Sequence, residues 1–391
     1  MSKEPRILYV APLRDFSGYA HAARDYVRAL DISGCNLVTR HLKYDNGNYS
    51  NSPREEELAS RDLQDVDIVI QHTTPNETEP KPGVFNVIYF AWETDRVPKE
   101  WVEQINKMDL ALVPCDENIR ASRKSGVTIP MVKIPHAFDV SKYSAFCTPY
   151  YIPGADDYFK LLSICQYSKK KGVDALLKAY LSEFEPDENT LLILKIYVNA
   201  IKPDGQNERG RILELIAKMK ELMRLPAFPK IMVVHEVLDD LGVARLYKTS
   251  DAYVLASRGE GFSITHFDAM GYGVPPIAIN WGGPTEFITP DTGWLTDYTM
   301  APVIDMPNPL PYLYTAKENW AEPNIKSLRS AMRQAFTEWK ISKETNGLGP
   351  WADRKLACME RVKDFSYEKI GAMMKDAIMK HYYMWKESHV H

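Results

Sequence analysis

Short apolar runs alternate with amphipathic stretches along most of the chain, and this alternation constrains the fold more than any other feature. Each run is rich in Val, Ile, Leu or Phe and is bounded by Pro, Gly or charge, as is typical of parallel strands covered on both faces. In the first half, the runs lie at residues 6–11, 67–70, 85–90, 110–113 and 131–134. Helical patterns separate them at residues 18–30, 99–107 and 117–124. The alternation predicts βαβ units and a doubly wound sheet.

The periodicity stops at residues 136–157, where Pro149 to Gly154 reads as an interdomain linker. It then restarts, with expected strands at residues 161–164, 191–197, 231–235, 252–255 and 276–279. Helical patterns follow at residues 173–184, 209–224, 324–339 and 366–386, and the proline-rich residues 300–314 are expected to form a surface loop. The second half therefore repeats the architecture of the first.

A chain of 391 residues is too long for one ordinary hydrophobic core. We expect an α/β protein of two Rossmann-like domains facing across a cleft. The expected domains lie at 1–145 and 146–365, and a C-terminal helix at 366–391 follows them.

Composition weighs against several classes of protein. The net charge of -4 offers no global basic field for nucleic acid or an anionic membrane. No segment approaches the roughly 20 apolar residues of a membrane span, and the N-terminal residues lack a signal-peptide layout. The five cysteines are dispersed and odd in number, which is typical of reduced thiols in a cytoplasmic compartment. They lie at Cys35, Cys115, Cys147, Cys165 and Cys358.

The most informative segment runs from Ser257 to Pro276, SRGEGFSITHFDAMGYGVPP. A strand at residues 252–255 leads into a glycine-containing turn, and a helix is expected to begin near Ser263. The unpaired N–H groups of a helix N-terminus suit a diphosphate, and Gly259 and Gly261 allow the backbone to approach it. The two acids of the segment, Glu260 and Asp268, are expected to accept hydrogen bonds from sugar or ribose hydroxyls.

This segment resembles the E-x7-E segment of retaining GT-B glycosyltransferases, specifically the large family-4 group. The resemblance implies that Glu260 contacts the transferring sugar and that Asp268, which stands where the family usually has Glu, binds the ribose. It also implies that the diphosphate is held by the backbone of Phe262, Ser263 and Ile264. For the domains, it implies an acceptor-side domain at 1–145, a nucleotide-sugar-binding domain at 146–365, and a C-terminal helix at 366–391 that packs back on the first domain.

Other segments match the family in the expected order. Ser168 to Asp174 resembles its basic segment, in which Lys171 would contact the donor phosphates. Gln166 stands where many members carry an additional Arg, and Lys169 or Lys170 would supply that charge. Asn280 to Glu286 matches the family's glycine loop, and a subgroup shares Phe90 to Pro98 and Trp320 to Pro323.

The first half offers fewer candidates. Gly18 opens a helix after the first strand, where it would meet phosphate or acceptor, or serve an ordinary βα loop. Trp92, Glu93 and Asp95 follow a strand end where other family members often carry a cleft His. Glu93 or Asp95 would replace that His or cap the next helix. His72, His136 and His266 are interpreted as structural, and no residues have metal spacing.

The sequence thus predicts a metal-independent, retaining glycosyltransferase without a cofactor, which uses a nucleotide-diphosphate sugar as co-substrate. The acceptor hydroxyl is left open among saccharide, lipid-linked, small-molecule, protein and hydroxylated DNA base. Two alternatives remain: a nucleotide-sugar epimerase on the same fold, and a non-catalytic nucleotide-sugar-binding protein. The base pocket is expected near residues 195–199 and 236–239.

Overall fold

The computed structural model describes residues 4–44, 47, 49–197, 205–304, 306 and 313–389, with the side chains of 205–208 excepted. The contacts divide this chain into two compact units. The first unit contains residues 4–140, 313–318 and 363–389, and the second contains residues 141–304, 306 and 319–362. Residues 313–318, which lie within the expected second domain in sequence, thus belong with the first unit.

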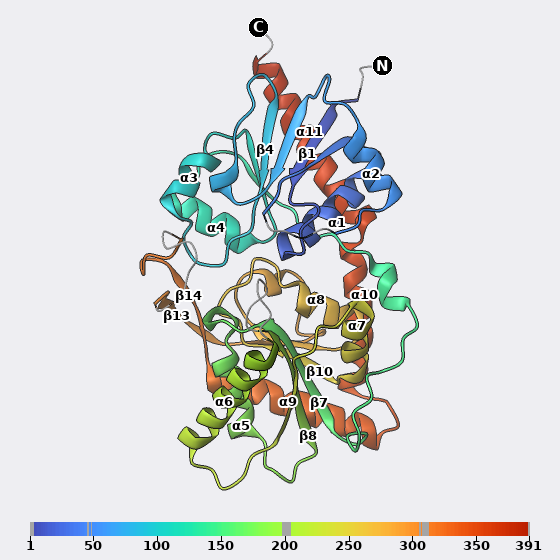
Figure 1. Ribbon diagram of the computed structural model, residues 1–391, viewed down its shortest axis with the longest axis vertical. Helices are drawn as coiled ribbons and strands as arrows, with labels where there is room; N and C mark the ends of the chain where they lie inside the picture. The colour runs from blue at the N-terminus through green and yellow to red at the C-terminus, as the bar shows by residue number, and fades with distance from the viewer. Residues whose placement is uncertain are drawn as a thin grey trace. The chain divides into compact units, whose positions relative to one another are not determined.

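The first unit is built on a six-stranded sheet in the order β2-β1-β3-β4-β5-β6, and all its neighbours pair in parallel (Figure 1). Buried strands such as β3 present an apolar side chain to both faces, which is why helices cover the sheet. The strands are β1 (Arg6–Ala11), β2 (Asn36–His41), β3 (Ile68–His72), β4 (Phe85–Tyr89), β5 (Leu110–Val113) and β6 (Met131–Lys133). The helices are α1 (Gly18–Ile32), α2 (Pro53–Ser60), α3 (Lys99–Ile105), α4 (Asp116–Ser125) and α11 (Tyr367–His389).

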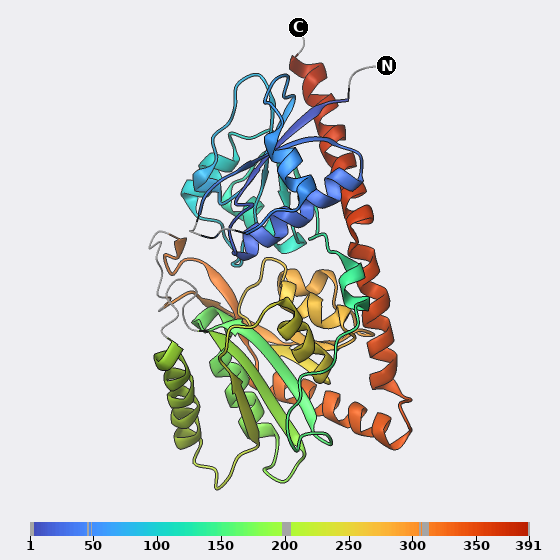
Figure 2. The ribbon, with the colours of Figure 1, turned by 45° about the vertical axis from the view of Figure 1, so that its right-hand side comes forward.

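Helix α11 packs against α1, although the two are far apart in sequence (Figure 2). The approach is close at Gly371, where an added Cβ would lie 2.1 Å from the carbonyl oxygen of Ala29. The Tyr367 hydroxyl also donates to Asp25 Oδ1 at 2.6 Å. The C-terminal helix therefore completes the layer on one face of the first sheet.

The second unit is built on another six-stranded parallel sheet, in the order β12-β11-β10-β7-β8-β9. An antiparallel hairpin of β13 (Tyr298–Pro302) and β14 (Asn319–Pro323) accompanies it. The sheet strands are β7 (Phe159–Gln166), β8 (Thr190–Tyr197), β9 (Lys230–Val234), β10 (Ala252–Leu255), β11 (Pro276–Ile279) and β12 (Trp294–Thr296). The helices are α5 (Val173–Glu183), α6 (Gly205–Met223), α7 (Asp240–Thr249), α8 (Ile264–Gly271), α9 (Ile325–Glu344) and α10 (Pro350–Arg361).

The fold confirms the expectation of two Rossmann-like domains. Strands β1, β5, β10 and β11 have the predicted bounds, whereas β2, β12 and the hairpin were not predicted. In the described ranges, no helix combines the length and the apolar character that a membrane span needs. The five cysteines form no disulfide.

Candidate active site

The candidate site lies where the strand order of the second sheet reverses. From β7 the chain moves outward to β8 and β9, and then returns to place β10 on the opposite side of β7. Ligands of open α/β sheets bind outside the carboxyl ends of the strands at such a reversal. The 3₁₀ turn η3 (Lys169–Lys171) follows β7, and the segment 257–263 follows β10. The basic segment and the acidic segment of the sequence therefore meet at one edge.

Lys171 and Glu260 form the centre of this site. The Lys171 ammonium Nζ lies 2.6 Å from Glu260 Oε1, and the two side chains are 23% and 10% exposed. Burial raises the pKa of the Glu260 carboxyl, but the charges of Lys171 and Lys170 outweigh it and leave the pKa below its ordinary value. Glu260 is therefore a carboxylate at neutral pH, beside a cation.

Helix α8 begins at this edge in an unusual backbone conformation. Ser263, its N-cap residue, has φ 80° and ψ 73°, in the left-handed region that non-glycine residues rarely adopt. Its hydroxyl does not cap the helix but bonds to His266 Nδ1 at 2.7 Å. His266 Nε2 in turn lies 3.2 Å from the Ile277 carbonyl oxygen. The buried histidine thus holds Ser263 in place, which agrees with its structural interpretation.

Two glycines allow the loops of the site to pack closely. Gly172 follows the lysine turn at φ +63°, and a Cβ there would lie 1.8 Å from the Ala256 carbonyl oxygen. Gly283 donates its N–H to the Glu260 carbonyl oxygen at 2.9 Å, and a Cβ on it would lie 2.2 Å from Phe262 Cα. The glycine loop expected from the sequence therefore packs directly against the backbone of Glu260 and Phe262.

Arg258 is a buried residue of the site that the sequence analysis missed. Its guanidinium bonds to both carboxylate oxygens of Glu322 at 2.6 Å and to both of Asp174 at 3.1 Å. It also donates to the Lys169 carbonyl oxygen, and its backbone N–H donates to the Lys170 carbonyl oxygen at 2.7 Å. Arg258 therefore ties the lysine turn to β10 and β14. A charged residue three positions after a buried strand and two positions before Glu260 was the signal in the sequence.

Asp268 is held by the segment that connects the two units in sequence. Its Oδ1 accepts a hydrogen bond from the Tyr143 hydroxyl at 2.7 Å and pairs with Lys142 Nζ at 2.8 Å. Among the described residues, Oδ2 has no hydrogen-bond partner. The Tyr143 ring lies against Gly271, where an added Cβ would approach it to 2.5 Å. The contacts of Asp268 thus fix one oxygen of its carboxylate, and its binding of a ribose hydroxyl stays a prediction.

The candidates of the first unit have structural partners. Trp92 is 3% exposed and packs against Trp101 with ring centroids 4.7 Å apart. Asp95 pairs with Lys124 at 2.6 Å, and the N-cap residue of α3, Pro98, makes no side-chain cap. The Tyr314 hydroxyl lies 3.5 Å from Glu93 Oε2. The geometry favours a structural role for Asp95 and leaves a catalytic role for Glu93 as a prediction.

The remaining candidates are placed as follows. Gly18 is the first residue of α1, and Ser17 caps that helix by accepting a hydrogen bond from Ala20 N at 3.2 Å. Asp239, expected near a base pocket, caps α7 by accepting a hydrogen bond from Gly242 N at 2.7 Å, and the pocket stays a prediction. Residues 198 and 199 of that expected pocket lie outside the described residues. Within the described part of the chain, His, Cys, Asp and Glu side chains nowhere gather as a metal-ligand set.

The comparisons with known proteins agree with this geometry. Residues 159–302, which contain both Lys171 and Glu260, match the family described as "Glycosyl transferases group 1". A search of curated protein sequences finds no match. The matched residues include the loops after β7 and β10, where the strand order of the second sheet reverses. These are the loops that form the candidate site.

Several solved structures share the fold at low sequence identity. The Anabaena protein HepE, solved with UDP and glucose, has a TM-score of 0.60 at 13% identity, covering 96% of this chain and all of its own (100%). Sucrose-phosphate synthase from Thermosynechococcus elongatus has a TM-score of 0.63 at 16% identity, with coverages of 97% and 100%. A trehalose-6-phosphate protein from E. coli, bound with UDP-2-fluoro glucose, has a TM-score of 0.63 at 12% identity, with coverages of 96% and 99%. These similarities identify the GT-B fold over nearly the whole chain.

Proposed function

We propose that this chain, a glycosyltransferase with a group 1 domain on a GT-B fold, transfers a sugar from a nucleotide diphosphate to a hydroxyl acceptor. We further propose that the anomeric configuration is retained and that no metal ion takes part. The observation that carries the proposal is the contact of Lys171 with Glu260 at the reversal of the second sheet. It unites a phosphate-binding cation and a hydroxyl-binding carboxylate at the edge where such sheets bind ligands.

The two partners suit the two halves of a nucleotide sugar. Binding of the donor would exchange the direct ion pair for two new contacts, from Lys171 Nζ to a phosphate oxygen and from a sugar hydroxyl to the Glu260 carboxylate. Lys171 would then stabilise the negative charge that develops on the departing diphosphate. Glu260 would orient the sugar so that its anomeric carbon faces the acceptor.

The backbone amides that begin α8 are proposed to share the diphosphate charge with Lys171. The first N–H groups of a helix have no intrahelical partner, and they lie at the positive end of its dipole. Ser263 and Ile264 supply such groups directly after Glu260. Amides and an ammonium group together can neutralise a diphosphate, which is why we propose transfer without a divalent cation. Addition of a chelator should therefore leave the transfer rate within about twofold of the rate measured without chelator.

Asp268 Oδ2 is proposed to accept a hydrogen bond from the ribose. Its other oxygen is occupied by Tyr143 and Lys142, which orients the carboxylate even though its side chain is one methylene shorter than Glu. The nucleotides named in the HepE and E. coli structures make UDP-glucose the first donor to test.

The donor site is tested by calorimetry with UDP on the whole chain. A charge-assisted contact contributes about 1.5–3 kcal/mol, so Lys171→Ala should weaken binding by about 10- to 150-fold. Lys326→Ala, at an exposed lysine of α9, is the matched control and should bind UDP as the parent does. Equal affinity of the parent and Lys171→Ala would contradict the donor site.

The reaction class is tested by following UDP-glucose with and without a panel of hydroxyl acceptors. Glucosyl transfer that requires an acceptor supports the proposal, and product with the α-linkage of the donor supports retention. Conversion of the donor sugar to its epimer in the absence of acceptor would instead identify an epimerase. Tight binding without transfer to any acceptor would favour a binding protein.

A further inference from the structure

The first unit contains a cavity outside the carboxyl ends of β1 and β2. Its volume is about 180 Å³, and helix α2 and the loop after β1 contribute to its walls. All its lining residues belong to the first unit, so it is separate from the donor site of the second. The charged and polar lining residues are Arg14, Arg24, Arg40, His41, Asn51 and Glu55.

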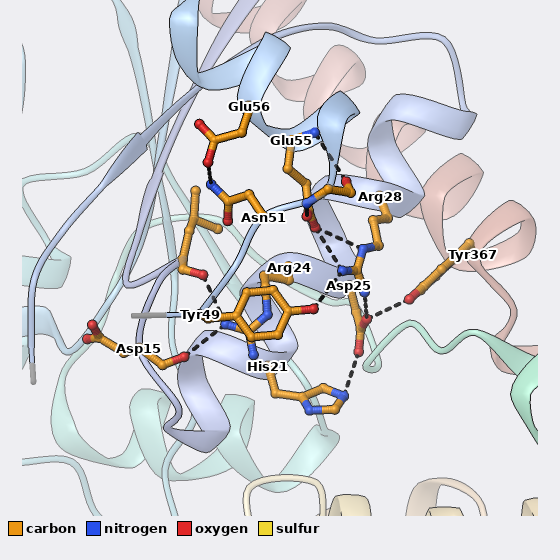
Figure 3. Close-up of polar contacts among 12 residues, drawn as sticks. Asp15, His21, Arg24, Asp25, Arg28, Tyr49, Asn51, Glu55, Glu56 and Tyr367 are labelled. Atoms are coloured by element: carbon orange, nitrogen blue, oxygen red, sulfur yellow. Dashed lines mark hydrogen bonds and ion pairs between the residues drawn. The ribbon is translucent and has the colours of Figure 1, made fainter. Parts of the chain in front are cut away.

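Arg24 is the most buried cation of this cavity, with 6% of its surface exposed. Its Nη1 donates to the carbonyl oxygens of Leu13 and Asp15, both at 2.9 Å. The guanidinium carbon lies 3.8 Å from the centre of the Tyr49 ring, and Figure 3 shows the stacked pair. Burial is the main cause that lowers the pKa of Arg24 from its ordinary value. The Arg24 side chain is thus held by two carbonyl oxygens and an aromatic ring, in a buried environment where a positive charge is unfavourable.

Arg40 is held in the same manner from the other side of the cavity. Its guanidinium donates to the carbonyl oxygens of Thr39, Ala59 and Arg61 at 2.7, 2.8 and 2.6 Å. Among the described residues, neither Arg24 nor Arg40 forms an ion pair with a carboxylate. Two cations therefore line one small space with carbonyl oxygens as their bonded partners.

The neighbouring carboxylates have partners other than Arg24 and Arg40. Glu55 accepts from Arg28 Nε at 3.0 Å, a contact drawn in Figure 3. Glu56 accepts from Arg14 at 3.0 Å, and Asp15 lies 3.7 Å from His41. Since these acids have their own partners, the cavity keeps a positive balance. A buried cation without a paired anion is costly, and an anionic ligand would offset that cost.

We propose that this cavity binds the phosphate or carboxylate of a small hydroxylated molecule. Arg24 and Arg40 would bond to the anionic group, because planar guanidinium groups match both phosphate and carboxylate oxygens. Glu55 Oε2 also accepts from Ser52 N at 2.6 Å, and Asn51 Nδ2 donates to Glu56 Oε1 at 3.0 Å. Asn51 and Glu55 would bond to hydroxyls of the attached body with the capacity that these contacts leave, since a carboxylate has about four acceptor positions. A water molecule has a share of about 30 Å³ in the liquid, so the cavity has room for an anionic group and a few attached atoms.

The test measures binding to the whole chain by calorimetry with three probes. Glucose 6-phosphate carries a phosphate, glucuronate carries a carboxylate, and glucose is the neutral control. We expect saturable binding of at least one anionic probe at one site per chain, at least about tenfold tighter than glucose. Which anion binds more tightly distinguishes a phosphorylated from a carboxylated ligand. Binding of neither, or equal binding of glucose, would overturn the proposal.

Variants locate the site. Arg24→Gln should lower the affinity for the anionic probe about tenfold or more. Because Arg24 also holds a loop, Ala59→Leu is a second variant that fills the cavity from α2 and retains every charge. Arg54→Gln, which removes an exposed cation of α2 with side-chain exposure of 49%, is the matched charge control and should bind as the parent does. Unchanged affinity in both Arg24→Gln and Ala59→Leu would overturn the assignment.

The donor site is excluded by one further variant. Lys171→Ala should bind the anionic probe with the parent's affinity, because Lys171 belongs to the second unit. Loss of probe binding in Lys171→Ala, with retention in Ala59→Leu, would place the probe at the donor site and overturn the proposal. Since no arm measures transfer, the result is independent of the proposed function.

Discussion

Lys171 and Glu260 are 89 residues apart in sequence, and their side chains meet at 2.6 Å. The pair joins the loop after β7 to the loop after β10, so one contact closes the carboxyl edge of the sheet where its order reverses. Both side chains are largely buried, and a buried charge is costly without an opposite charge beside it. Each partner supplies that opposite charge for the other. Changes at this pair should therefore affect binding and catalysis in different ways.

Replacement of Glu260 by Gln should remove transfer and preserve the fold. Gln keeps the size and can still accept a hydrogen bond, but it removes the charge that we propose to orient the sugar in the transition state. We expect the transfer rate to fall by roughly two to four orders of magnitude, with circular dichroism unchanged. Glu344→Gln, at an exposed position of α9, is the control. A Glu260→Gln rate within a few-fold of the parent would refute the role of the carboxylate.

Arg258→Lys should weaken donor binding through the lysine turn. A lysine cannot reproduce the double contacts with Glu322 and Asp174, so the backbone of the turn loses an anchor. We expect the donor Kd to rise about tenfold, by analogy with one lost charge-assisted contact.

The control for Arg258→Lys is a substitution of Arg333, which also bonds to two carboxylates but lies outside the candidate site. Arg333 bonds to Glu183 at 2.7 Å and to Glu188 at 3.0 Å. Arg333→Lys should lower stability to a similar extent and leave the donor Kd unchanged. If both variants shift the Kd equally, Arg258 acts on stability alone and has no positioning role.

Gly172→Ala should destabilise the second unit. Left-handed backbone costs a non-glycine residue about 1–2 kcal/mol, and the new Cβ would meet the Ala256 carbonyl oxygen. We expect a loss of more than about 2 kcal/mol in urea unfolding. Gly210→Ala is the control, since a Cβ at that helical position meets nothing within 4 Å. It should gain roughly 0.5–1 kcal/mol, and equal effects at the two positions would contradict the close approach.

His266 should make the protein less stable as the pH falls from about 6.5 to 4. Burial lowers its pKa to about 4, against about 6.5 in an unfolded chain. In that window the unfolded state binds the proton and the folded state does not, so unfolding becomes easier at lower pH. The full effect is about 3 kcal/mol.

The measurement for His266 compares unfolding free energies of the parent and His266→Gln between pH 4 and 7. The difference between the two should shrink as the pH falls, because only the parent loses this contribution. His72 and His136 are also buried and their pKa values are also lowered, but they are common to both chains. A difference that is constant with pH would show that His266 does not titrate on unfolding.

The sequence predicted the elements whose signal is local. Strand β10 was found at its bounds because four consecutive apolar residues lie between a charge and a polar turn. Strand β2 was missed because Asn36–His41 has polar residues at both ends and only a short apolar centre. Its partner β1 buries it, and that pairing is not visible in the segment itself.

Within the site, motif order predicted Lys171 and Glu260 but not what holds them. The partners of Arg258 lie 84 and 64 residues away, and no local pattern connects them. The sequence analysis assigned a close approach to the diphosphate to Gly259 and Gly261, which stays a prediction. It did not foresee the left-handed backbone at Gly172, Ser263 and Gly282. A hydroxyl bond to His266 supports that strain, so tertiary contacts overrode the intrinsic preference of serine.

The packing of α11 on α1 has a consequence for biosynthesis. Between the end of α1 at Ile32 and the start of α11 at Tyr367 lie more than 300 residues. At about 5–20 residues per second, the ribosome needs roughly 15 to 70 s to make them. During that time the surface of α1 around Ala29 has no covering helix, while the whole second unit is being synthesised. The nascent first unit is therefore the part of the chain on which we expect a chaperone to act.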